Sequence, residues 1–253
     1  MKEFNKVYIN SIGKHLPNSP VTNDEMEEYL GEIAGKPSRT KERRQKQNGI
    51  LTRYYALDKD QNSTDSVSGM ASKAIQDCLI KAKVNPDEIE LLAAGTTQGD
   101  LPVPGFASMV HAESNLPICN LVSHQSVCAS GIMALKSAFL HVQSNENQNA
   151  IACASDMPSR MFKASRFAKQ PKIQEKGLPL DTDFLRWMLS DGAGAIYISN
   201  KPNQNGLSLE IEWIDVKSYA NSFDVCMYAG TNKKRDGSIE KYWLDYEDFS
   251  SAD

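Results

Sequence analysis

Four short apolar runs that carry almost no charge constrain the fold of this chain more than any other feature. They lie at residues 89–96, 117–124, 149–155 and 194–199. Runs of this length and composition are typical of central strands that are covered on both faces of a sheet. Helical patterns lie between several of them, and this alternating order predicts a layered α/β fold with a mostly parallel sheet.

Further elements are predicted from other patterns. Residues 6–13 alternate as in a short strand. Thr22 stands three residues before Glu25, which is a capping box that predicts a helix through about Ile33. Between residues 66 and 82, apolar residues recur at spacings of three and four, which predicts an amphipathic helix whose apolar stripe faces the sheet.

The sequence changes character near residue 200. Residues 201–206 mark a break, and a new alternating strand is predicted from Leu207. The rest of the chain is polar and lacks the helices and strands needed to complete another layer. We therefore predict one complete unit over residues 1–200 and a second unit over residues 201–253 that has only begun, as if truncated.

The composition excludes several classes of function. A net charge of -4 gives no general attraction to nucleic acid or to an anionic membrane. No apolar run is long enough for a signal peptide or a membrane span, so we expect a cytoplasmic protein. The five cysteines are scattered and have no neighbouring histidine at zinc-ligand spacing, so neither a disulfide framework nor a metal site is predicted.

Cys128 is the residue best placed to carry chemistry. A strand predicted to end near Gln125 leads into a largely apolar helix that begins close to this cysteine. The partial positive charge and free N–H groups of a helix N-terminus favour a thiolate, which is the form that attacks acyl groups. Because the helix is apolar around most of its circumference, we expect it to be buried. The alternative is that Cys128 only fills space, since free cysteines are often buried.

The segment VCASG around Cys128 resembles the nucleophile segment of the thiolase-like condensing enzymes. Four further segments resemble motifs of the ketosynthase III family and lie in the order found there. They are NGILTRYYA at 48–56, AAGTTQGDLPVPGFA at 93–107, ACASDMPSR at 152–160 and LSDGAGAIYIS at 189–199. A single glycine-rich turn is usually only a turn, but five segments in register make the resemblance strong. The segment SHQSVCASGIMALK, with the basic loop before it, also resembles the branch that forms dialkylresorcinols.

The resemblance implies a thiolase-like fold with α-β-α-β-α layers, built from two similar halves. This chain would hold the first half in full, over residues 1–200, and only the beginning of the second. It also implies a ping-pong reaction in which Cys128 takes an acyl group from an acyl-coenzyme A or acyl-carrier-protein thioester. The acyl group is then condensed with a malonyl or other β-keto thioester, in fatty-acid, polyketide or related biosynthesis. The family needs no metal or redox cofactor for this reaction, and a homodimer or a heterodimer of thiolase-fold chains is expected.

The family takes a histidine, and an asparagine or second histidine, from its C-terminal half. None of the four histidines of this chain lies in a matching motif, so we expect these catalytic partners beyond residue 253 or in another chain. His124 lies four residues before Cys128, on the strand that leads into the nucleophile turn. We expect it to be a satisfied histidine of the core or of a tunnel wall.

Further site residues are predicted from the same resemblance and from charge. Val103 stands in the dimer-interface loop where some members carry a phenylalanine gate, so a longer or bulkier acyl chain is expected. Arg53 matches the arginine of the family's Gly-Ile-x-x-Arg segment and is a candidate for substrate binding, with a buried structural ion pair as the alternative. A basic run near the expected tunnel mouth would contact a carrier protein or a phosphate, or would only solubilise the surface. Its candidate residues are Arg39, Arg43 and Arg44.

Two other functions stay open at this point. An acyltransferase could use the same cysteine to pass acyl groups to oxygen or nitrogen. A noncatalytic thiolase-fold subunit could instead support an active partner. The cysteine counts against a noncatalytic subunit, whereas the missing histidine motif favours it.

Overall fold

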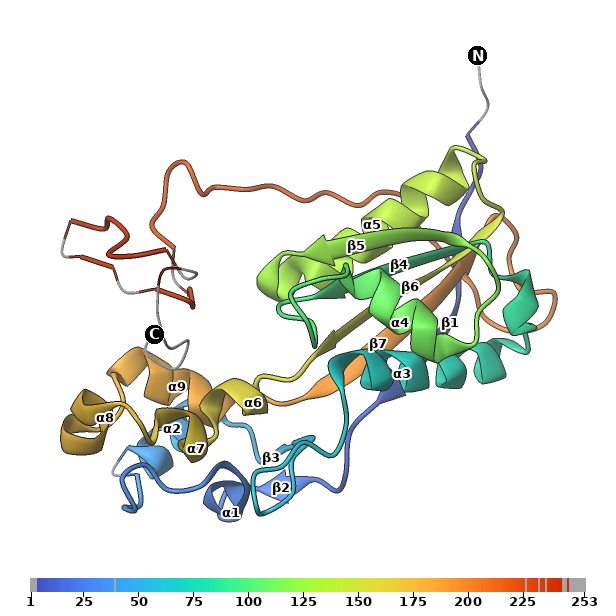
Figure 1. The fold of residues 1–253 in the computed structure, drawn as a ribbon. Coiled ribbons are helices and arrows are strands. Elements are labelled where there is room, and N and C mark those ends of the chain that lie inside the picture. The colour runs from blue at the N-terminus through green and yellow to red at the C-terminus, as the bar shows by residue number, and fades with distance from the viewer. Residues whose placement is uncertain are drawn as a thin grey trace.

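The computed structural model describes residues 4–38, 40–225, 227–231, 233–234, 236–242 and 245. A six-stranded main sheet carries helices on its faces, and a smaller lobe lies at one end of it (Figure 1). The strands of the main sheet are β1 (Tyr8–His15), β4 (Leu91–Thr96), β5 (Asn120–Gln125), β6 (Asn149–Asp156), β7 (Gly192–Ser199) and β8 (Leu209–Glu210). Their order in the sheet is β5, β4, β6, β7, β1 and β8.

The main sheet is mixed, so the prediction of a mostly parallel sheet is wrong. β4 is parallel to both β5 and β6, whereas β7 is antiparallel to β6 and β1, and β8 is antiparallel to β1. The long segment between β6 and β7 leaves the sheet at the C-terminal end of β6 and returns beside the same end, since Asp156 at the end of β6 pairs with Gly192 at the start of β7. A neighbouring strand that begins beside the end of β6 must run antiparallel to it.

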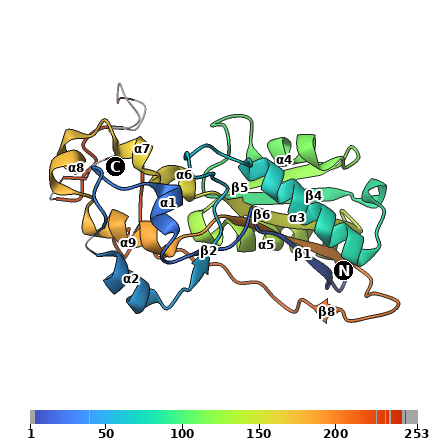
Figure 2. The same ribbon diagram turned by 90° about the horizontal axis from the view of Figure 1, so that it is seen from below.

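Helices cover both faces of the main sheet (Figures 1 and 2). The helices on the sheet are α3 (Val67–Ala82), α4 (Phe106–Ser114) and α5 (Ser130–Gln143). Successive residues of β4 point to opposite faces, with Leu92 in the core under α3 and α4 and Leu91 in the core under α5. The predicted layered α/β fold and the predicted amphipathic helix are therefore confirmed. No helix in the described part of the chain is both long and apolar enough to cross a membrane.

β5 differs from the predicted strands that are covered on both faces. It lies at the edge of the main sheet, and its side chains are exposed or only half-buried. Ile118, just before the strand, is fully exposed, and Leu121 on the strand is exposed as well. Within the described residues β5 pairs with β4 alone.

α3 contacts the backbone of β1 at Gly13. A Cβ atom at Gly13 would lie 2.3 Å from the carbonyl oxygen of Ala74 and 2.4 Å from the backbone nitrogen of Cys78. The helix therefore rests on the strand with no side chain between them. Only glycine fits at this position, because the nearest atoms belong to backbone that cannot move aside locally.

The small lobe lies beyond the edge where β6 ends and β7 begins (Figure 1). It contains β2 (Val21–Thr22), β3 (Thr52–Arg53), α1 (Met26–Leu30), α2 (Lys41–Asn48), α6 (Ser159–Phe162), α7 (Ala164–Phe167), α8 (Pro171–Lys176) and α9 (Leu180–Met188). Only half of the predicted capping box is present. The Glu25 carboxylate accepts the Thr22 N–H at 2.9 Å and the Thr22 hydroxyl at 2.6 Å, but the N-cap of α1 is Glu25 and the Thr22 hydroxyl donates to it. α1 is shorter than predicted, because Gly31 takes a positive φ of 75° and ends it.

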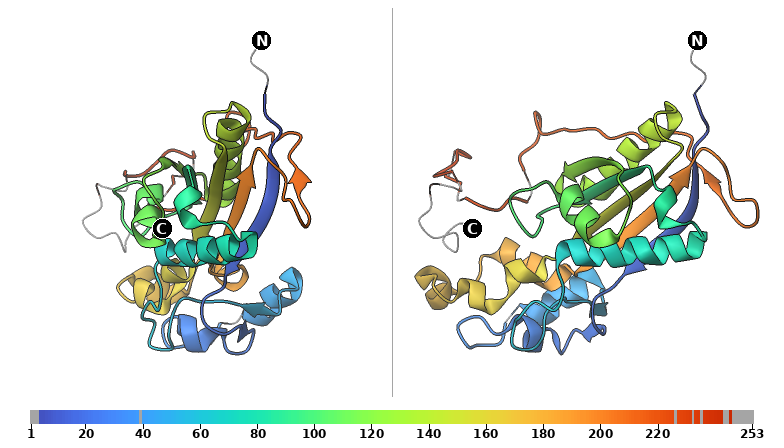
Figure 3. Two further views of the ribbon diagram at one scale, coloured as in Figure 1. Left: turned by 90° about the vertical axis from the view of Figure 1, so that its right-hand side faces the viewer. Right: turned by 45° about the vertical axis from the view of Figure 1, so that its right-hand side comes forward.

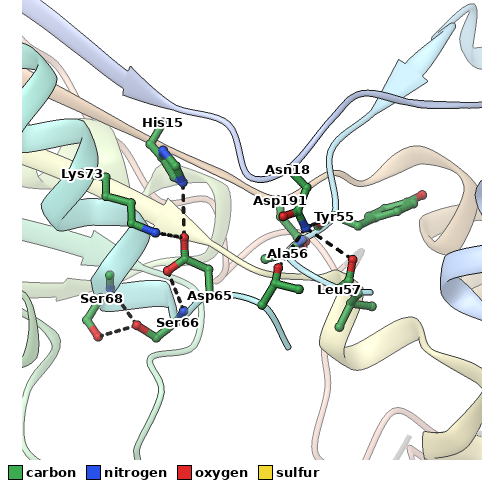
Figure 4. Close-up of polar contacts among 12 residues, drawn as sticks. His15, Asn18, Tyr55, Ala56, Leu57, Asp65, Ser66, Ser68, Lys73 and Asp191 are labelled. Atoms are coloured by element: carbon green, nitrogen blue, oxygen red, sulfur yellow. Dashed lines mark hydrogen bonds and ion pairs between the residues drawn. The ribbon is translucent and has the colours of Figure 1, made fainter. Parts of the chain in front are cut away.

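A buried carboxylate joins the small lobe to the main sheet. Asp191 accepts the Ala56 N–H at 2.7 Å, the Ser159 N–H at 3.0 Å and the Ser159 hydroxyl at 2.5 Å. Its own N–H donates to the Tyr54 carbonyl at 2.8 Å. Figure 4 shows Asp191 close to Ala56, which comes from a distant part of the sequence. Burial raises the pKa of Asp191 to about 6, although these hydrogen bonds oppose the rise.

The chain after β8 runs along the outside of the molecule (Figure 3). The prediction of a long alternating strand from Leu207 is therefore wrong. Only the two residues of β8 form a strand, and one further backbone bond follows it, from the Ile211 N–H to the Val7 carbonyl at 2.9 Å. β8 runs antiparallel to β1, so residues after Ile211 lie beside residues that precede Tyr8. Those residues precede the start of β1, so they offer β8 no strand to pair with. The division of the chain at residue 200 stays a prediction.

Gly13→Ala should lower the free energy of unfolding by about 3 kcal/mol, because the added methyl group must push α3 away from β1. Gly194→Ala is a matched control on a neighbouring strand, since its Cβ would meet nothing nearer than the Gly13 carbonyl oxygen at 3.9 Å. Urea unfolding of the two variants and the parent measures the effect. Equal losses in the two variants would contradict the close contact.

The buried carboxyl of Asp191 should make stability depend on pH. Its folded pKa of about 6 lies above the unfolded value of about 3.9, so the folded state holds the proton more tightly. This contribution to the free energy of unfolding is complete below about pH 4 and is lost as the pH rises through about 6, by about 3 kcal/mol at most. Urea unfolding between pH 4 and 7 should show the parent losing stability relative to Asp191→Asn, and parallel curves would refute the assignment.

Candidate active site

The C-terminal ends of three neighbouring strands meet at one edge of the main sheet. β4 ends at Thr96, β5 at Gln125 and β6 at Asp156, and the parallel pairings of β4 place these ends side by side. Ligands of α/β sheets usually bind at the carboxyl ends of parallel strands. Cys128 follows β5 directly, in a single turn of 3-10 helix (η2, Val127–Ala129) that leads into α5.

Cys128 differs from the other cysteines in its exposure. Of the four described cysteines it is the exposed one, whereas Cys78 and Cys153 are buried and Cys119 is half-buried. Burial raises the pKa of all three of these thiols, that of Cys153 to about 12. Cys226 lies outside the described residues. The alternative that Cys128 only fills space is therefore not supported.

The backbone just before the thiol is strained. Val127 has a φ of 47°, in the left-handed region that a β-branched residue adopts only at a cost of about 1 to 3 kcal/mol. This residue turns the chain sharply between β5 and α5. Strained residues of this kind cluster at functional sites, because the surrounding structure must hold them in place.

Hydrogen bonds of one buried hydroxyl close the turn around Cys128. The Ser130 side chain accepts the Ser126 N–H at 2.8 Å. Its oxygen also lies 2.9 Å from the Thr96 carbonyl oxygen and 2.7 Å from the Val127 carbonyl oxygen, so its single proton serves one or the other. Ser130 is only 1% exposed, and the turn is thus tied both to itself and to the end of β4.

Asp156 joins the ends of the three strands where their backbone pairing stops. Its Oδ1 accepts the Thr97 N–H at 2.7 Å and the Thr96 hydroxyl at 3.2 Å. The Thr97 carbonyl in turn accepts a hydrogen bond from the Gln125 side-chain amide at 2.9 Å. Burial raises the pKa of Asp156, against the opposing effect of the hydrogen bonds from both threonines.

α5 rests directly on β4 beneath the turn. A Cβ atom at Gly95 would lie 2.4 Å from the Ser130 carbonyl oxygen, so the helix backbone contacts the strand. Ala134 continues this buried face. The expectation that α5 is buried all round is wrong, because Ile132 and Leu140 on its other side are 43% and 48% exposed. The main sheet covers one face of the helix only.

Each of the four histidines has a hydrogen-bond partner outside the Cys128 turn. The partners are Asp65 for His15, the Pro117 carbonyl for His111, Ser137 for His124 and Asn147 for His141. Figure 4 shows His15 and Lys73 converging on Asp65, at the start of α3. The bond of His124 to α5 agrees with the expected role of a satisfied wall histidine, and burial lowers its pKa. In the described part of the chain, no group of three or more His, Cys, Asp or Glu side chains is placed to hold a metal ion.

Val103 lies on the loop between β4 and α4 and is 78% exposed. The base of this loop is held by Asp100, whose carboxylate accepts the N–H groups of Val67 and Ser68, both at 2.9 Å. Arg160 pairs with the same carboxylate at 3.1 Å, so this arginine has a structural partner. The loop therefore presents an exposed apolar side chain above a well-anchored base.

Arg53 is fully buried in the small lobe. It donates to the Trp187 carbonyl at 2.6 Å, and to the Ile50 carbonyl and the Asn23 side chain at 2.9 Å each. These neutral partners favour the structural alternative, although hydrogen bonds take the place of the expected ion pair. A contact of Arg53 with substrate stays a prediction.

The basic run that was expected to contact a carrier lies around α2. Arg43 is exposed on this helix, whereas Arg44 is half-buried and its guanidinium lies 5.6 Å from the centre of the Phe184 ring. Arg39 lies outside the described residues. Of the two candidates that the structure describes, Arg44 stacks on Phe184, and Arg43 is exposed.

Sequence reasoning missed two roles near Cys128. Ser130 was expected only to leave room for a substrate as a small residue, and its hydrogen bonds were not predicted. Asp156 was not singled out, although it lies in a segment that resembles the family. For Asp156 a signal was available, since it is an aspartate directly after the apolar run 149–155. Polar residues at strand ends often belong to a site.

The sequence is similar to curated β-ketoacyl-[acyl-carrier-protein] synthase III enzymes. Over 157 residues the chain is 27% identical to the β-ketoacyl-[acyl-carrier-protein] synthase III of Cereibacter sphaeroides, covering 62% of this chain and 45% of that protein. Over 201 residues it is 23% identical to the enzyme of the same name from Staphylococcus aureus, covering 79% and 55%. The chain therefore spans about half the length of the curated relatives it matches. No family model matches it.

A solved structure shares the fold. The 3-oxoacyl-(acyl carrier protein) synthase III of Pseudomonas aeruginosa superposes with a TM-score of 0.64 at 17% identity, over 92% of this chain and 63% of that chain. At this identity the likeness shows the fold. The thiolase-like layered fold expected from the sequence is thus confirmed for the part of the chain that the superposition covers.

Val127→Asn should raise the free energy of unfolding by about 1 kcal/mol, because asparagine adopts a positive φ at lower cost than a β-branched residue. Val127→Thr keeps the branch at Cβ and is the matched control, with no gain expected. Urea unfolding compares the three proteins. Asparagine and threonine variants of equal stability would show that Val127 is not strained.

Proposed function

We propose that this chain, a thiolase-like relative of the β-ketoacyl-[acyl-carrier-protein] synthase III enzymes, takes an acyl group onto Cys128 as the first step of a condensation that forms a carbon–carbon bond. The observation that carries the proposal is the exposed thiol of Cys128, held in a strained and hydrogen-bonded turn at the carboxyl edge of the main sheet. The other described cysteines lack this combination of exposure and setting.

The proposed step exchanges one thioester for another. The sulfur of Cys128, as thiolate, attacks the carbonyl carbon of an acyl thioester and forms a new C–S bond. The bond from that carbon to the sulfur of the carrier breaks, and the carrier thiol leaves with a proton from solvent. Atoms and charges balance without an oxidant or a reductant.

The position of Cys128 relative to α5 supports this chemistry. η2 leads straight into the 14 residues of α5, so the positive end of the helix lies next to the thiol. Negative charge beside a helix N-terminus is stabilised by the unpaired N–H groups of the first turn. This favours the oxyanion that forms as the sulfur attacks.

The second step needs groups that the described residues do not supply. Negative charge builds on a thioester oxygen of the extender and must be met by fixed donors. Every histidine of the chain is already bonded elsewhere. We infer that the histidine and asparagine of the condensation belong to a further thiolase-like half, in the same protein or in another chain. The coverage of about half of the relatives' length supports this inference.

The acyl donor is inferred to be a coenzyme A or acyl-carrier-protein thioester, and the product to be of fatty-acid, polyketide or dialkylresorcinol type. Arg43, exposed on α2, supports contact with an acidic carrier or a phosphate. The exposed apolar tip at Val103 supports a role in acyl selection. The open edge of β5 supports a homodimer or a thiolase-fold heterodimer, because an unpaired strand edge can pair with another chain. A cytoplasmic location stays a prediction.

The exposed thiol also bears on the two alternatives. A noncatalytic subunit has no need of an accessible cysteine in a strained turn, so this role is disfavoured. Acyl transfer to oxygen or nitrogen begins with the same acyl-cysteine and differs only in the acceptor. The similarity to synthases favours a carbon acceptor.

Intact mass spectrometry tests the acyl-cysteine directly. The parent protein, exposed to acyl-coenzyme A and acyl-carrier-protein donors of several chain lengths, should gain the mass of one acyl group. Cys128→Ala should gain none, whereas Cys119→Ala, which removes a half-buried thiol, should be acylated like the parent. An adduct that persists in Cys128→Ala, or no adduct from any donor, would refute the proposal.

A further inference from the structure

A chain of hydrogen bonds runs from β6 to the turn that carries Cys128. It starts at Asp156, whose Oδ1 accepts the Thr97 N–H at 2.7 Å and the Thr96 hydroxyl at 3.2 Å. It continues through the Ser130 hydroxyl, whose single proton is shared between the Thr96 carbonyl at 2.9 Å and the Val127 carbonyl at 2.7 Å. The Ser130 oxygen in turn accepts the Ser126 N–H at 2.8 Å. Ser126 and Ser130 enclose Cys128 in the sequence, so the chain ends on both sides of the thiol.

A second branch reaches the same turn from the strand that precedes it. The Thr97 carbonyl accepts the side-chain amide of Gln125, the last residue of β5, at 2.9 Å. Both branches therefore pass through the corner formed by Thr96 and Thr97. An interaction that fixes Thr96 and Thr97 therefore also fixes the segment from Gln125 to the start of α5, through these hydrogen bonds.

On the side facing β6 the corner depends on a side chain, because backbone pairing between β4 and β6 has ended there, whereas Thr96 is still paired with Gln125 of β5. The last backbone pair between β4 and β6 is Gly95 with Ala154. Beyond it the two strands are linked by the Asp156 carboxylate, which spans the gap to Thr97. Because a side chain, and not the backbone, makes this link between β4 and β6, a single substitution of Asp156 can remove it.

We propose that Asp156 is a positioning residue for Cys128, and that it acts as a hydrogen-bond acceptor which fixes the corner at Thr96 and Thr97 and, through it, the nucleophile turn. The inference rests on the acyl-cysteine function proposed above. A misplacement of about 1 Å at a reacting atom can slow a reaction by about a hundredfold, so loss of the anchor acts on acyl transfer more than on folding.

Variants of Asp156 in the 253-residue chain separate positioning from stability. Asp156→Leu removes the acceptor at similar size, and Asp156→Asn keeps an acceptor oxygen in place. Asp87→Leu is the matched control, since Asp87 is exposed on the 3-10 turn η1 (Pro86–Glu88) at the opposite end of β4. Three quantities are measured by mass spectrometry and thermal unfolding. They are the rate of acylation of Cys128 by octanoyl-coenzyme A, the rate of its alkylation by iodoacetamide, and the melting temperature.

Asp156→Leu should slow acylation at least about tenfold. It should slow alkylation about threefold, because the thiol loses its place at the helix N-terminus. Asp156→Asn and Asp87→Leu should stay within about twofold of the parent in both rates. A purely structural role would lower the melting temperature without changing rates measured well below it. Parent rates in Asp156→Leu, or an Asn variant as slow as the Leu variant, would overturn the proposal.

Ser130→Ala covers the case in which Asp156→Leu does not fold. It breaks the next link of the same chain and should slow both reactions to a similar degree, whereas parent rates in this variant would overturn the positioning role. If the parent itself is not acylated by any donor, the proposed function fails. The alkylation rates then still decide whether Asp156 positions the thiol.

Discussion

The contact between the backbone of β4 at Gly95 and the backbone of α5 at Ser130 is the constraint on which the candidate site depends. With no side chain between them, the start of the helix cannot shift along the strand. The few residues that connect β5 to α5 must then turn sharply in a fixed space. The positive φ of Val127 is the cost of that turn, and the exposure of Cys128 is its result. The close packing of α5 on β4 thus accounts for the strained backbone at Val127.

Two partly or fully buried carboxylates organise the edge of the sheet at which this turn lies. Asp156 ends β6 and holds the nucleophile side, whereas Asp191 precedes β7 and holds the small lobe. Burial raises the pKa of both. The hydrogen bonds described above for the two carboxylates come from backbone N–H and hydroxyl donors, and the charge of Arg160 adds a smaller stabilisation of the Asp191 carboxylate. Directional hydrogen bonds therefore hold this end of the sheet, and they fix the relative positions of the bonded groups better than an ion pair does.

Local patterns in the sequence predicted most elements, and the failures have physical causes. Apolar runs located β4, β6 and β7, and periodicity located α3. The direction of β7 was not predictable, since it depends on where the segment after Asp156 returns. The exposure of β5 and α5 was not predictable either, because coverage depends on which elements pack there. Cys128 was identified from its own segment, whereas the contact of Asp156 with Thr97 was not predictable from local patterns, because Thr97 lies 59 residues away.

The place of β1 in the sheet has a consequence for the synthesis of the protein. Among the described strands β1 comes first in the sequence, yet its two neighbours in the sheet are β7 and β8, and Tyr8 pairs with Ser199. Pairing between residues so far apart in sequence forms slowly, because a long loop must close first. On the ribosome, β1 waits with α3 as its early cover until β7 has emerged.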